Sequence, residues 1–470
     1  MEVQIISREL IKPSSPTVQH KRPYKLTLLD QLTPTTYSPL ILFYPMNNIS
    51  TTLQTLTHLK AHLKESLSQT LNLYYPFSGR PTCDNLYINR FNEGVPFFEA
   101  KVNCSMSVSH CSMSEFLKLH QTELLNSFLP CNPFTKEVSI EIPIIAFQVS
   151  MFTCGGITLG LSMSHKLIDA VTASAFMSTW TSLHRRDFNG VIAPYLHEPS
   201  LFFPSRISFP QGHLSLMESL WFTEANYITK RFSFNPKAIA TLKTMAKGDR
   251  KNNVDQPTRI ETLSCFIWKY YMQASSMVES SRGSESRTSI LVEAVDLRKK
   301  TKPPMHNGSI DNGSIGNLFW WAVAVADPND KKNTELHELA SLLSESVGVY
   351  KTEYTHSLQG DNGHETMSEY CEQLSELFSL EKPDIFAFTS WCNTSATKLD
   401  FGWGEPYWVG VMGKAGAAFR NLTVFVVFVD AKDGKGVEAW ITLDDERMEI
   451  LQRNPEFLAF ASPNPRISSL

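Results

Sequence analysis

The stretch Gly156–Phe176, GITLGLSMSHKLIDAVTASAF, contains the point at which one periodic pattern ends and another begins. Apolar residues alternate over 157–163, which predicts a strand, and recur at helical spacing over 171–183, which predicts a helix. His165 is the next position in phase with the inward side of the strand, and Asp169 lies where it can cap the helix. The sequence therefore predicts a rigid turn that holds a titratable side chain at the end of an interior strand.

A second strand is predicted just before this one. Apolar residues mostly alternate over 138–152, and the segment Cys154-Gly155-Gly156 separates the two alternating runs. Two such runs around a glycine pair predict a β-hairpin, with Ser162 on the outward face of its second strand.

The rest of the chain predicts helices and strands interspersed. Leucine recurs at helical spacing over 56–71, and Pro76 and Gly79 end that helix. Further predictions are a helix at 256–274, a flexible loop at 275–289, a buried strand at 289–297, a strand pair at 421–431 and 436–443, and loops near 301–314 and 355–365. This mixture favours an α/β fold with mixed sheets.

The length of the chain predicts its domain organisation. Because 470 residues exceed one ordinary core, we expect two domains. We place an N-terminal domain at 1–190 and a C-terminal domain at 231–470, and we expect the Pro-, Phe- and Ser-rich segment 191–230 to cross between them.

Composition excludes several classes of protein. A net charge of -4 argues against nucleic acid or an anionic membrane as the main partner. The longest apolar runs, LFWWAVAVA (318–326) and VFVVFV (424–429), have the length of strands and are too short to span a bilayer. The start of the chain shows no signal-peptide pattern, and the eight cysteines show no paired spacing. We interpret the cysteines as reduced core residues of a cytoplasmic protein.

His165 and Asp169 form a His-x-x-x-Asp motif that has more than one interpretation. A histidine in a partly dry, rigid turn suits a general base near neutral pH, but the motif alone fits a structural histidine at least as well. A metal site is a further alternative, although no third ligand is evident nearby. The segment lacks the second glycine of a G-x-S-x-G nucleophile motif, and the chain has no phosphate-binding or dinucleotide-binding loop.

A second distinctive string is DFGWG, which runs from Asp400 to Gly404 within Phe388–Pro406. Two glycines around two aromatic residues indicate a tight backbone turn that packs under rings. A purely structural corner is one interpretation of this string.

Together the two motifs, in this order and about 230 residues apart, resemble the BAHD family of plant acyl-CoA-dependent acyltransferases. Other segments are similar to family landmarks, so the resemblance covers nearly the whole chain: LLDQLTPTTYSPLILFYP (28–45), YYPFSGR (74–80), AVDLRKK (294–300), SIGNLFWW (314–321) and FTSWC (388–392). The resemblance implies two similar-sized, chloramphenicol-acetyltransferase-like domains, each a mixed sheet with helices, and a channel between them.

The resemblance also implies roles for individual residues. His165 would be the general base, and Asp169 would point away from the chemistry and pair with Arg298. Thr389 and Trp391 would face the reacting groups as oxyanion donors. A structural role is implied for the second motif, through Asp400, Gly402, Trp403 and Gly404. The family usually has glycine where this chain has Ala170, a residue that the first turn of a helix accepts.

The implied reaction moves an acyl group from coenzyme A to a hydroxyl group in a ternary complex. Acyl-CoA would be the co-substrate of a cytoplasmic monomer with no permanently bound cofactor and no metal. ISRELIKPSSPT (6–17) and SIGNLFWWAVA (314–324) resemble the branch that acylates sucrose, so our first expectation for the acceptor is a sugar such as sucrose or an acylsucrose.

Other functions stay open at this point. The residues SHK and DA within 164–170 are similar to the branch that acetylates alkaloids, which makes an alkaloid hydroxyl the alternative acceptor. A catalytically silent relative that binds metabolites is an alternative of another class, and a hydrolase of acyl-CoA or esters is a third.

Overall fold

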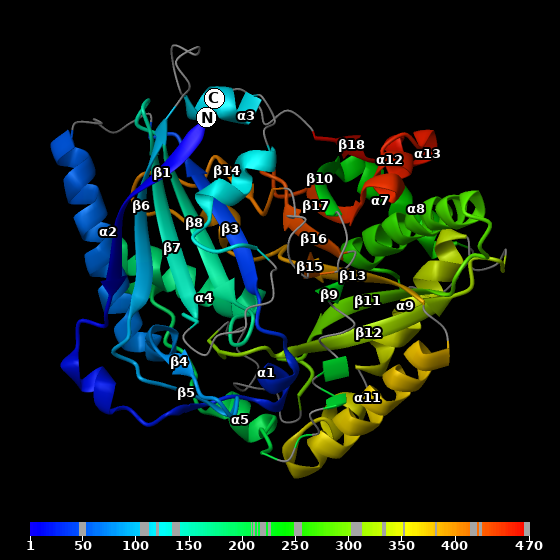
Figure 1. The fold of residues 1–470 in the computed structure, drawn as a ribbon, viewed down its shortest axis with the longest axis horizontal. Helices are drawn as coiled ribbons and strands as arrows, with labels where there is room; N and C mark the ends of the chain where they lie inside the picture. Colours follow the sequence, from blue (N-terminus) through cyan, green and yellow to red (C-terminus); the bar gives the residue numbers. More distant parts are fainter. Residues whose placement is uncertain are drawn as a thin grey trace.

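A computed structural model shows two halves that lie side by side, each built on a mixed sheet (Figure 1). The structure describes residues 1–46, 53–103, 112–118, 122–133, 142–207, 209, 212–213, 215–216, 222–223, 227–248, 256–301, 313–330, 335–350, 353–380, 383–413, 421–422 and 425–464.

The first sheet has the strand order β1-β6-β7-β8-β3-β14. Its strands are β1 (Glu2–Ile11), β6 (Val95–Asn103), β7 (Ile145–Phe152), β8 (Ile157–Ser164), β3 (Tyr37–Tyr44) and β14 (Trp408–Gly410). Neighbours run antiparallel except β6 and β7, which are parallel. The predicted hairpin is confirmed as β7–β8, with Phe147 opposite Leu161.

The second sheet has the strand order β12-β11-β13-β16-β17-β10-β18. Its strands are β12 (Phe319–Ala326), β11 (Ser289–Asp296), β13 (Asp384–Ser390), β16 (Phe425–Asp430), β17 (Val437–Asp444), β10 (Tyr227–Phe234) and β18 (Ser462–Pro463). β13 runs parallel to both β11 and β16, while the other neighbours are antiparallel. The predicted strand pair after residue 420 is β16–β17.

Helices cover the sheets. α2 (Leu53–Leu73) packs against α4 (Ala170–His184), whose Trp180 contacts Phe147 of β7. In the second half α7 (Pro236–Lys247), α8 (Arg259–Ser281) and α9 (Leu336–Val349) pack on one another, and α12 (Asp445–Leu451) packs on α8. The other α-helices among the described residues are α1 (Leu28–Leu32), α3 (Met113–Lys118), α5 (Glu198–Phe202), α10 (Glu353–Ser357), α11 (Gly363–Leu380) and α13 (Pro455–Leu458). Short strands β2 (Tyr24–Lys25), β4 (Arg80–Pro81) and β5 (Tyr87–Asn89) form one small sheet, and β9 (Phe222–Thr223) pairs with β15 (Asn421–Leu422).

The two halves interlock through the segment around β14. Although these residues belong to the predicted C-terminal domain, β14 forms the edge of the first sheet next to β3. The Tyr407 amide donates to the Phe43 carbonyl at 2.7 Å, and the Tyr44 hydroxyl donates to the Leu399 carbonyl at 2.7 Å. The division into 1–190 and 231–470 stays a prediction, and the sheets do not follow it strand for strand.

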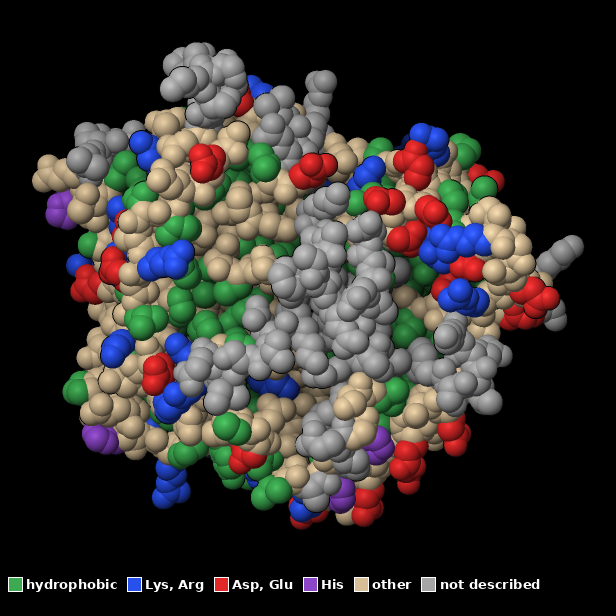
Figure 2. All heavy atoms as spheres, in the orientation of Figure 1, with side chains coloured by type: hydrophobic (Ala, Val, Ile, Leu, Met, Phe, Trp, Pro, Cys, Tyr) green, Lys and Arg blue, Asp and Glu red, His purple; other side chains and the backbone are tan. Residues whose placement is uncertain are grey.

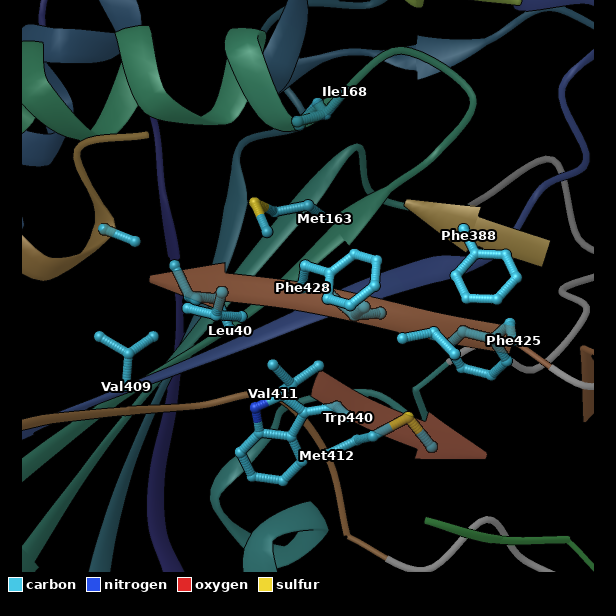
Figure 3. Close-up of a cluster of buried hydrophobic side chains, with 14 of the residues drawn as sticks. Leu40, Met163, Ile168, Phe388, Val409, Val411, Met412, Phe425, Phe428 and Trp440 are labelled. Atoms are coloured by element: carbon cyan, nitrogen blue, oxygen red, sulfur yellow. The ribbon is translucent and has the colours of Figure 1, made fainter. Parts of the chain in front are cut away.

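An apolar core fills the space where the halves meet. Figure 3 shows Leu40 and Met163 of the first sheet close to Phe428 and Trp440 of the second. All four side chains are almost completely buried. This packing holds the two sheets in a fixed relation, which a site built from both halves requires.

Two predictions of local structure are wrong. α8 continues through 275–281, a predicted loop, because Ser275 and Val278 remain buried on its inner face. Residues 355–365 hold the end of α10, a 3-10 turn and the start of α11 rather than a loop, because Met367 and Cys371 anchor α11 in the core.

Two further predictions need correction. β8 is buried on both faces, so Ser162, on the face opposite to Leu161 and Met163, is buried rather than exposed, and its Oγ accepts a hydrogen bond from the Cys131 amide at 3.2 Å. Among the described cysteines, which are free thiols, Cys83 and Cys154 are exposed rather than in the core. Positions 138–141 of the predicted hairpin and 302–312 of a predicted loop lie outside the described residues.

Candidate active site

The turn after β8 holds His165 as the sequence predicts. The strand ends at Ser164, and the His165 amide donates to the Thr36 carbonyl at 2.7 Å, which ties the turn to the segment before β3. Asp169 is the N-cap of α4, and its side chain accepts a hydrogen bond from the Thr172 amide at 2.8 Å. The backbone of the turn is therefore fixed at both ends.

Asp169 pairs with Arg298 from the other half. The two guanidinium nitrogens of Arg298 donate to the two carboxylate oxygens at 2.8 and 3.0 Å. Both side chains are buried, with exposed fractions of 8% and 7%. Burial alone would raise the pKa of Asp169, but the guanidinium and the Thr172 amide outweigh burial and hold that pKa below its ordinary value.

Asn317, just before β12, determines which nitrogen of His165 carries the proton. The Asn317 amide nitrogen donates to the His165 carbonyl at 2.7 Å and to Asp30 Oδ1 at 2.9 Å. Because both partners are acceptors, the Asn317 Oδ1 must face His165 Nδ1, 3.0 Å away. Nδ1 therefore carries the hydrogen, which leaves Nε2 with a free lone pair.

Asp30 supports Asn317 from α1. Besides the bond from the Asn317 side chain, the Asp30 carboxylate accepts hydrogen bonds from the backbone N–H of Asn317 at 2.7 Å and from the Thr27 hydroxyl at 2.8 Å. Even so, complete burial raises the pKa of Asp30 above its ordinary value. The chain Asp30–Asn317–His165 joins both halves of the molecule.

Lys166 fixes α1 beneath the same turn. Its buried ammonium group donates to the carbonyls of Asp30, Gln31 and Thr33, at the end of that helix. A cation at this position suits the negative end of the helix dipole. The residue next to His165 in sequence is therefore a structural cation.

His165 is electrostatically suited to act as a base. Burial lowers its pKa below the ordinary value, and Asp169 and Asn317 oppose burial only in part. The imidazole is consequently neutral at pH 7. Its ring lies 5.7 Å, centroid to centroid, from the ring of Phe319, which shields one side from water.

Two pockets meet at His165. The aromatic pocket has a volume of about 1120 Å³ including its open mouth, and its walls come from residues 32–36, 294–298, 319–321 and 387–391. The helix pocket, about 490 Å³, lies between α4, β3 and residues 394–399. The residues common to both walls are His165, Asp169, Ala170 and Trp391. A base at this position can reach a molecule in either pocket.

The two predicted oxyanion donors lie at this junction. Thr389, near the end of β13, lines the aromatic pocket, and Trp391, just beyond the strand, lines both pockets. The Trp391 amide donates to the Phe428 carbonyl at 2.8 Å, which fixes the backbone beneath the indole. Their role as donors to an oxyanion stays a prediction.

The DFGWG corner lies at the other end of α4 and lines neither pocket. Asp400 Oδ1 accepts hydrogen bonds from the amides of Gly402 and Gly404 at 2.7 and 2.8 Å. These glycines have φ values of +91° and +99°, which disfavour a residue with a side chain. The Arg185 side chain donates to the Asp400 carbonyl, and the Phe401 ring meets that of Trp180 edge-on at 5.0 Å.

Ala170 is the first residue of α4. It lines both pockets, and helical backbone at this position accommodates alanine without strain. The departure from the usual glycine therefore leaves the turn intact.

No pattern in the sequence indicates the role of Asn317 or of Asp30. Both lie in segments that resemble family landmarks, but no periodicity or spacing links them to His165, 152 positions away from Asn317.

Within the described residues no group of three His, Cys, Asp or Glu side chains could hold a metal ion. Across the described residues no helix is long and apolar enough to cross a membrane. Figure 2 shows acidic and basic side chains interspersed over the visible described surface.

Comparison with known proteins identifies the family. The model of the Transferase family matches residues 1–458. Akuammiline synthase 2 of Alstonia scholaris is 33% identical over 469 residues, which cover 99% of this chain and 98% of that protein. The chain belongs to the Transferase family, the BAHD acyltransferases.

Two further proteins agree with this membership. Limonoid 7-O-acetyltransferase of Citrus sinensis is 32% identical and covers 99% of each chain. The crystal structure of vinorine synthase superposes with a TM-score of 0.74 at 29% identity, covering 98% of this chain and 99% of that one. The predicted family, the two-domain mixed-sheet fold and the class of enzyme, an acyltransferase, are confirmed.

Proposed function

We propose that this BAHD acyltransferase moves a short acyl group, with acetyl as the first choice, from acyl-CoA to a hydroxyl group of a plant specialised metabolite. The observation that carries the proposal is the position of His165 where two pockets meet, with Nδ1 held by Asn317 and Nε2 left for substrate. A related limonoid O-acetyltransferase supports both the acetyl group and the hydroxyl acceptor.

The mechanism follows from the neutral imidazole. Nε2 of His165 takes the proton of the acceptor hydroxyl while its oxygen attacks the thioester carbonyl. The carbon–oxygen bond forms, and the negative charge on the former carbonyl oxygen is stabilised by Thr389 and Trp391. The intermediate then expels the thiolate of coenzyme A, which takes the proton back from the imidazolium. Since no acyl-enzyme is needed, both substrates are bound together.

The acceptor is expected to be large and mostly apolar. Leu32, Pro34 and Val171 join the aromatic residues in the wall of the aromatic pocket. A free sugar would need many hydroxyl and amide partners to replace water, and the described wall provides few. We therefore place a polycyclic alkaloid or terpenoid alcohol ahead of sucrose, which was the first expectation from the sequence.

An acceptor screen tests the function directly. The purified protein is incubated with acetyl-CoA and either sucrose, an acylsucrose, a limonoid alcohol or an alkaloid alcohol, while free thiol is measured. Thiol release that requires an acceptor supports the proposal. Acceptor-independent release would indicate a hydrolase, and no release with any acceptor or longer acyl-CoA would indicate a silent binding protein. Size-exclusion chromatography tests whether the protein is a monomer, and fluorescent tagging in plant cells tests whether it is cytoplasmic.

Removing the base tests the mechanism. We expect His165→Ala to lower kcat by at least about 10²-fold, the low end of general-base contributions. The melting temperature should change little, because the ring lies at a pocket wall. His197→Ala, at an exposed position, is the matched control. A His165→Ala protein that turns over at the wild-type rate would contradict the assignment.

A further inference from the structure

The wall of the aromatic pocket carries a carboxylate that the mechanism does not use. Asp296 ends β11 and lines this pocket, with 45% of its side chain exposed. Its Oδ1 accepts hydrogen bonds from the Arg298 amide at 3.2 Å and the Arg298 guanidinium at 3.1 Å. Its Oδ2 accepts no hydrogen bond from the described part of the chain. One oxygen is therefore available to a ligand.

The charges of the pocket wall leave an excess of negative charge. Arg298 lies between two carboxylates, Asp169 and Asp296. Apart from these three and the neutral His165, the described residues that line the aromatic pocket are uncharged. Lys299 and Lys300 follow Arg298 in sequence but are not part of the wall. A cation in the pocket would balance this charge, whereas the phosphates of coenzyme A would be repelled.

Two aromatic residues, Phe319 and Trp321, line the same pocket wall as this carboxylate. Asp296 lies directly opposite Phe319 in the antiparallel pair β11–β12, so the two side chains project from the same face of the sheet. The next pair on this face is Ala294 and Trp321, where the small alanine leaves space in front of the sheet. The rings of Phe319 and Trp321 meet edge-on at 5.3 Å.

We propose that Asp296, Phe319 and Trp321 bind a protonated amine of the acceptor. An ammonium group beside a carboxylate and over aromatic faces gains both Coulombic and cation–π stabilisation. The inference rests on the proposed function and adds the substrate class, a cationic amino alcohol such as an alkaloid alcohol. Phe319 is the cross-strand partner of Asp296, and its ring lies 5.7 Å from that of His165, so the proposed amine site is next to the base.

A pair of matched probes tests the proposal through binding alone. 1-Benzylpiperidin-4-ol is protonated at pH 7, and 4-benzylcyclohexanol is its neutral carbon analogue. Calorimetry on the intact protein should show about tenfold tighter binding of the cation. In Asp296→Asn, which keeps an acceptor for Arg298, this preference should fall to less than about twofold while affinity for the neutral probe stays close to wild type.

Control variants separate binding from structure. Asp327→Asn removes one negative charge from an exposed position just after β12 and should keep the tenfold preference. Trp321→Leu should lower the affinity for the cation more than for the neutral probe. Equal binding of the two probes by the wild type, or equal loss of both in Asp296→Asn with a lower melting temperature, would overturn the proposal.

The same proteins distinguish the two levels of inference. If acetyl-CoA is turned over with neutral alcohols and the wild type shows no preference for the cationic probe, the proposed function stands and the amine site is wrong. If the cation preference depends on Asp296 but no acceptor releases thiol, the amine site stands and the acyltransferase mechanism is wrong.

Discussion

Helix α4 meets one sequence motif at each end, and the two motifs act on it in different ways. At its start, His165 and Asp169 form a buried turn that lines both pockets. At its end, the corner from Asp400 to Gly404 packs against Trp180 and His184 and lines neither pocket. Both aspartates accept backbone N–H groups, but only Asp169 also has a buried arginine partner.

Both motifs therefore fix the position of α4, but only the motif at its start also lines the two pockets. The corner joins the second half to the far end of α4, and Asp169 joins the near end to Arg298. The helix is thus fixed relative to both sheets, and His165 is placed with it. Removing each contact should show which end affects chemistry and which affects stability alone.

The largest effect is expected at the near end. Asp169→Ala leaves the buried guanidinium of Arg298 without its main partner and removes the cap of α4, so we expect a loss of about 3–5 kcal/mol in unfolding free energy. Chemical denaturation measures it. Asp400→Ala is the matched change at the far end and should cost only about 1–2 kcal/mol, because its carboxylate binds two amides near the surface. Equal losses would contradict the comparison.

The next effect tests the corner itself. The Trp403 ring packs on Tyr44 at 5.5 Å and on Phe401 at 5.4 Å, and its Nε1 makes no hydrogen bond to the part of the chain that the structure describes. Trp403→Ala should therefore cost about 2–4 kcal/mol through lost packing, at the lower side of core values because the ring is partly exposed. We expect kcat and KM for acetyl-CoA to stay within about twofold per folded molecule. A large rise in KM without destabilisation would assign the corner to the coenzyme channel.

The two ends of α4 also show which parts of the fold and of the site can be predicted from the sequence. Alternation and helical spacing predicted β8, α4 and the cap Asp169, because these depend on neighbours in sequence. The pairing of Asp169 with Arg298 came from the family resemblance, and the structure contains it. Asn317 and Asp30 had no such signal, since their contacts join α1, β12 and β8 through tertiary packing alone. The same reason explains the wrong loop prediction at 275–281, where burial of Val278 continues a helix.

A pH-dependent effect is expected at the far end of α4. Burial, assisted by the nearby ring of His62, lowers the pKa of His184 from the ordinary 6.5 to about 4. The unfolded chain then binds a proton more readily than the folded one between these values. The contribution of the neutral His184 to the free energy of unfolding is therefore complete above pH 6.5. It falls by at most about 3 kcal/mol as the pH decreases to 4.

Melting curves between pH 7.5 and 4.5 check this effect. His184→Gln should show a shallower decrease in melting temperature than the wild type, and His197→Gln, at an exposed position, should follow the wild type. If His184→Gln loses stability as steeply as the wild type on acidification, the buried neutral histidine does not contribute.

The smallest effect isolates the chemistry of the near end. Asn317 positions His165 through Nδ1, so Asn317→Ala should lower kcat about tenfold by releasing the tautomer while leaving KM for acetyl-CoA unchanged. The hydrogen bond from Nδ1 raises the pKa of His165 against the effect of burial. Its loss should therefore move the acidic limb of the kcat–pH profile to lower pH. Thr27→Ala removes another hydrogen bond to Asp30 without touching His165, and so controls for a general loosening of the network. If the acidic limb moves equally in Asn317→Ala and Thr27→Ala, or in neither, Asn317 only supports the fold. The motif at the start of α4 would then have a structural role, like the corner at its end.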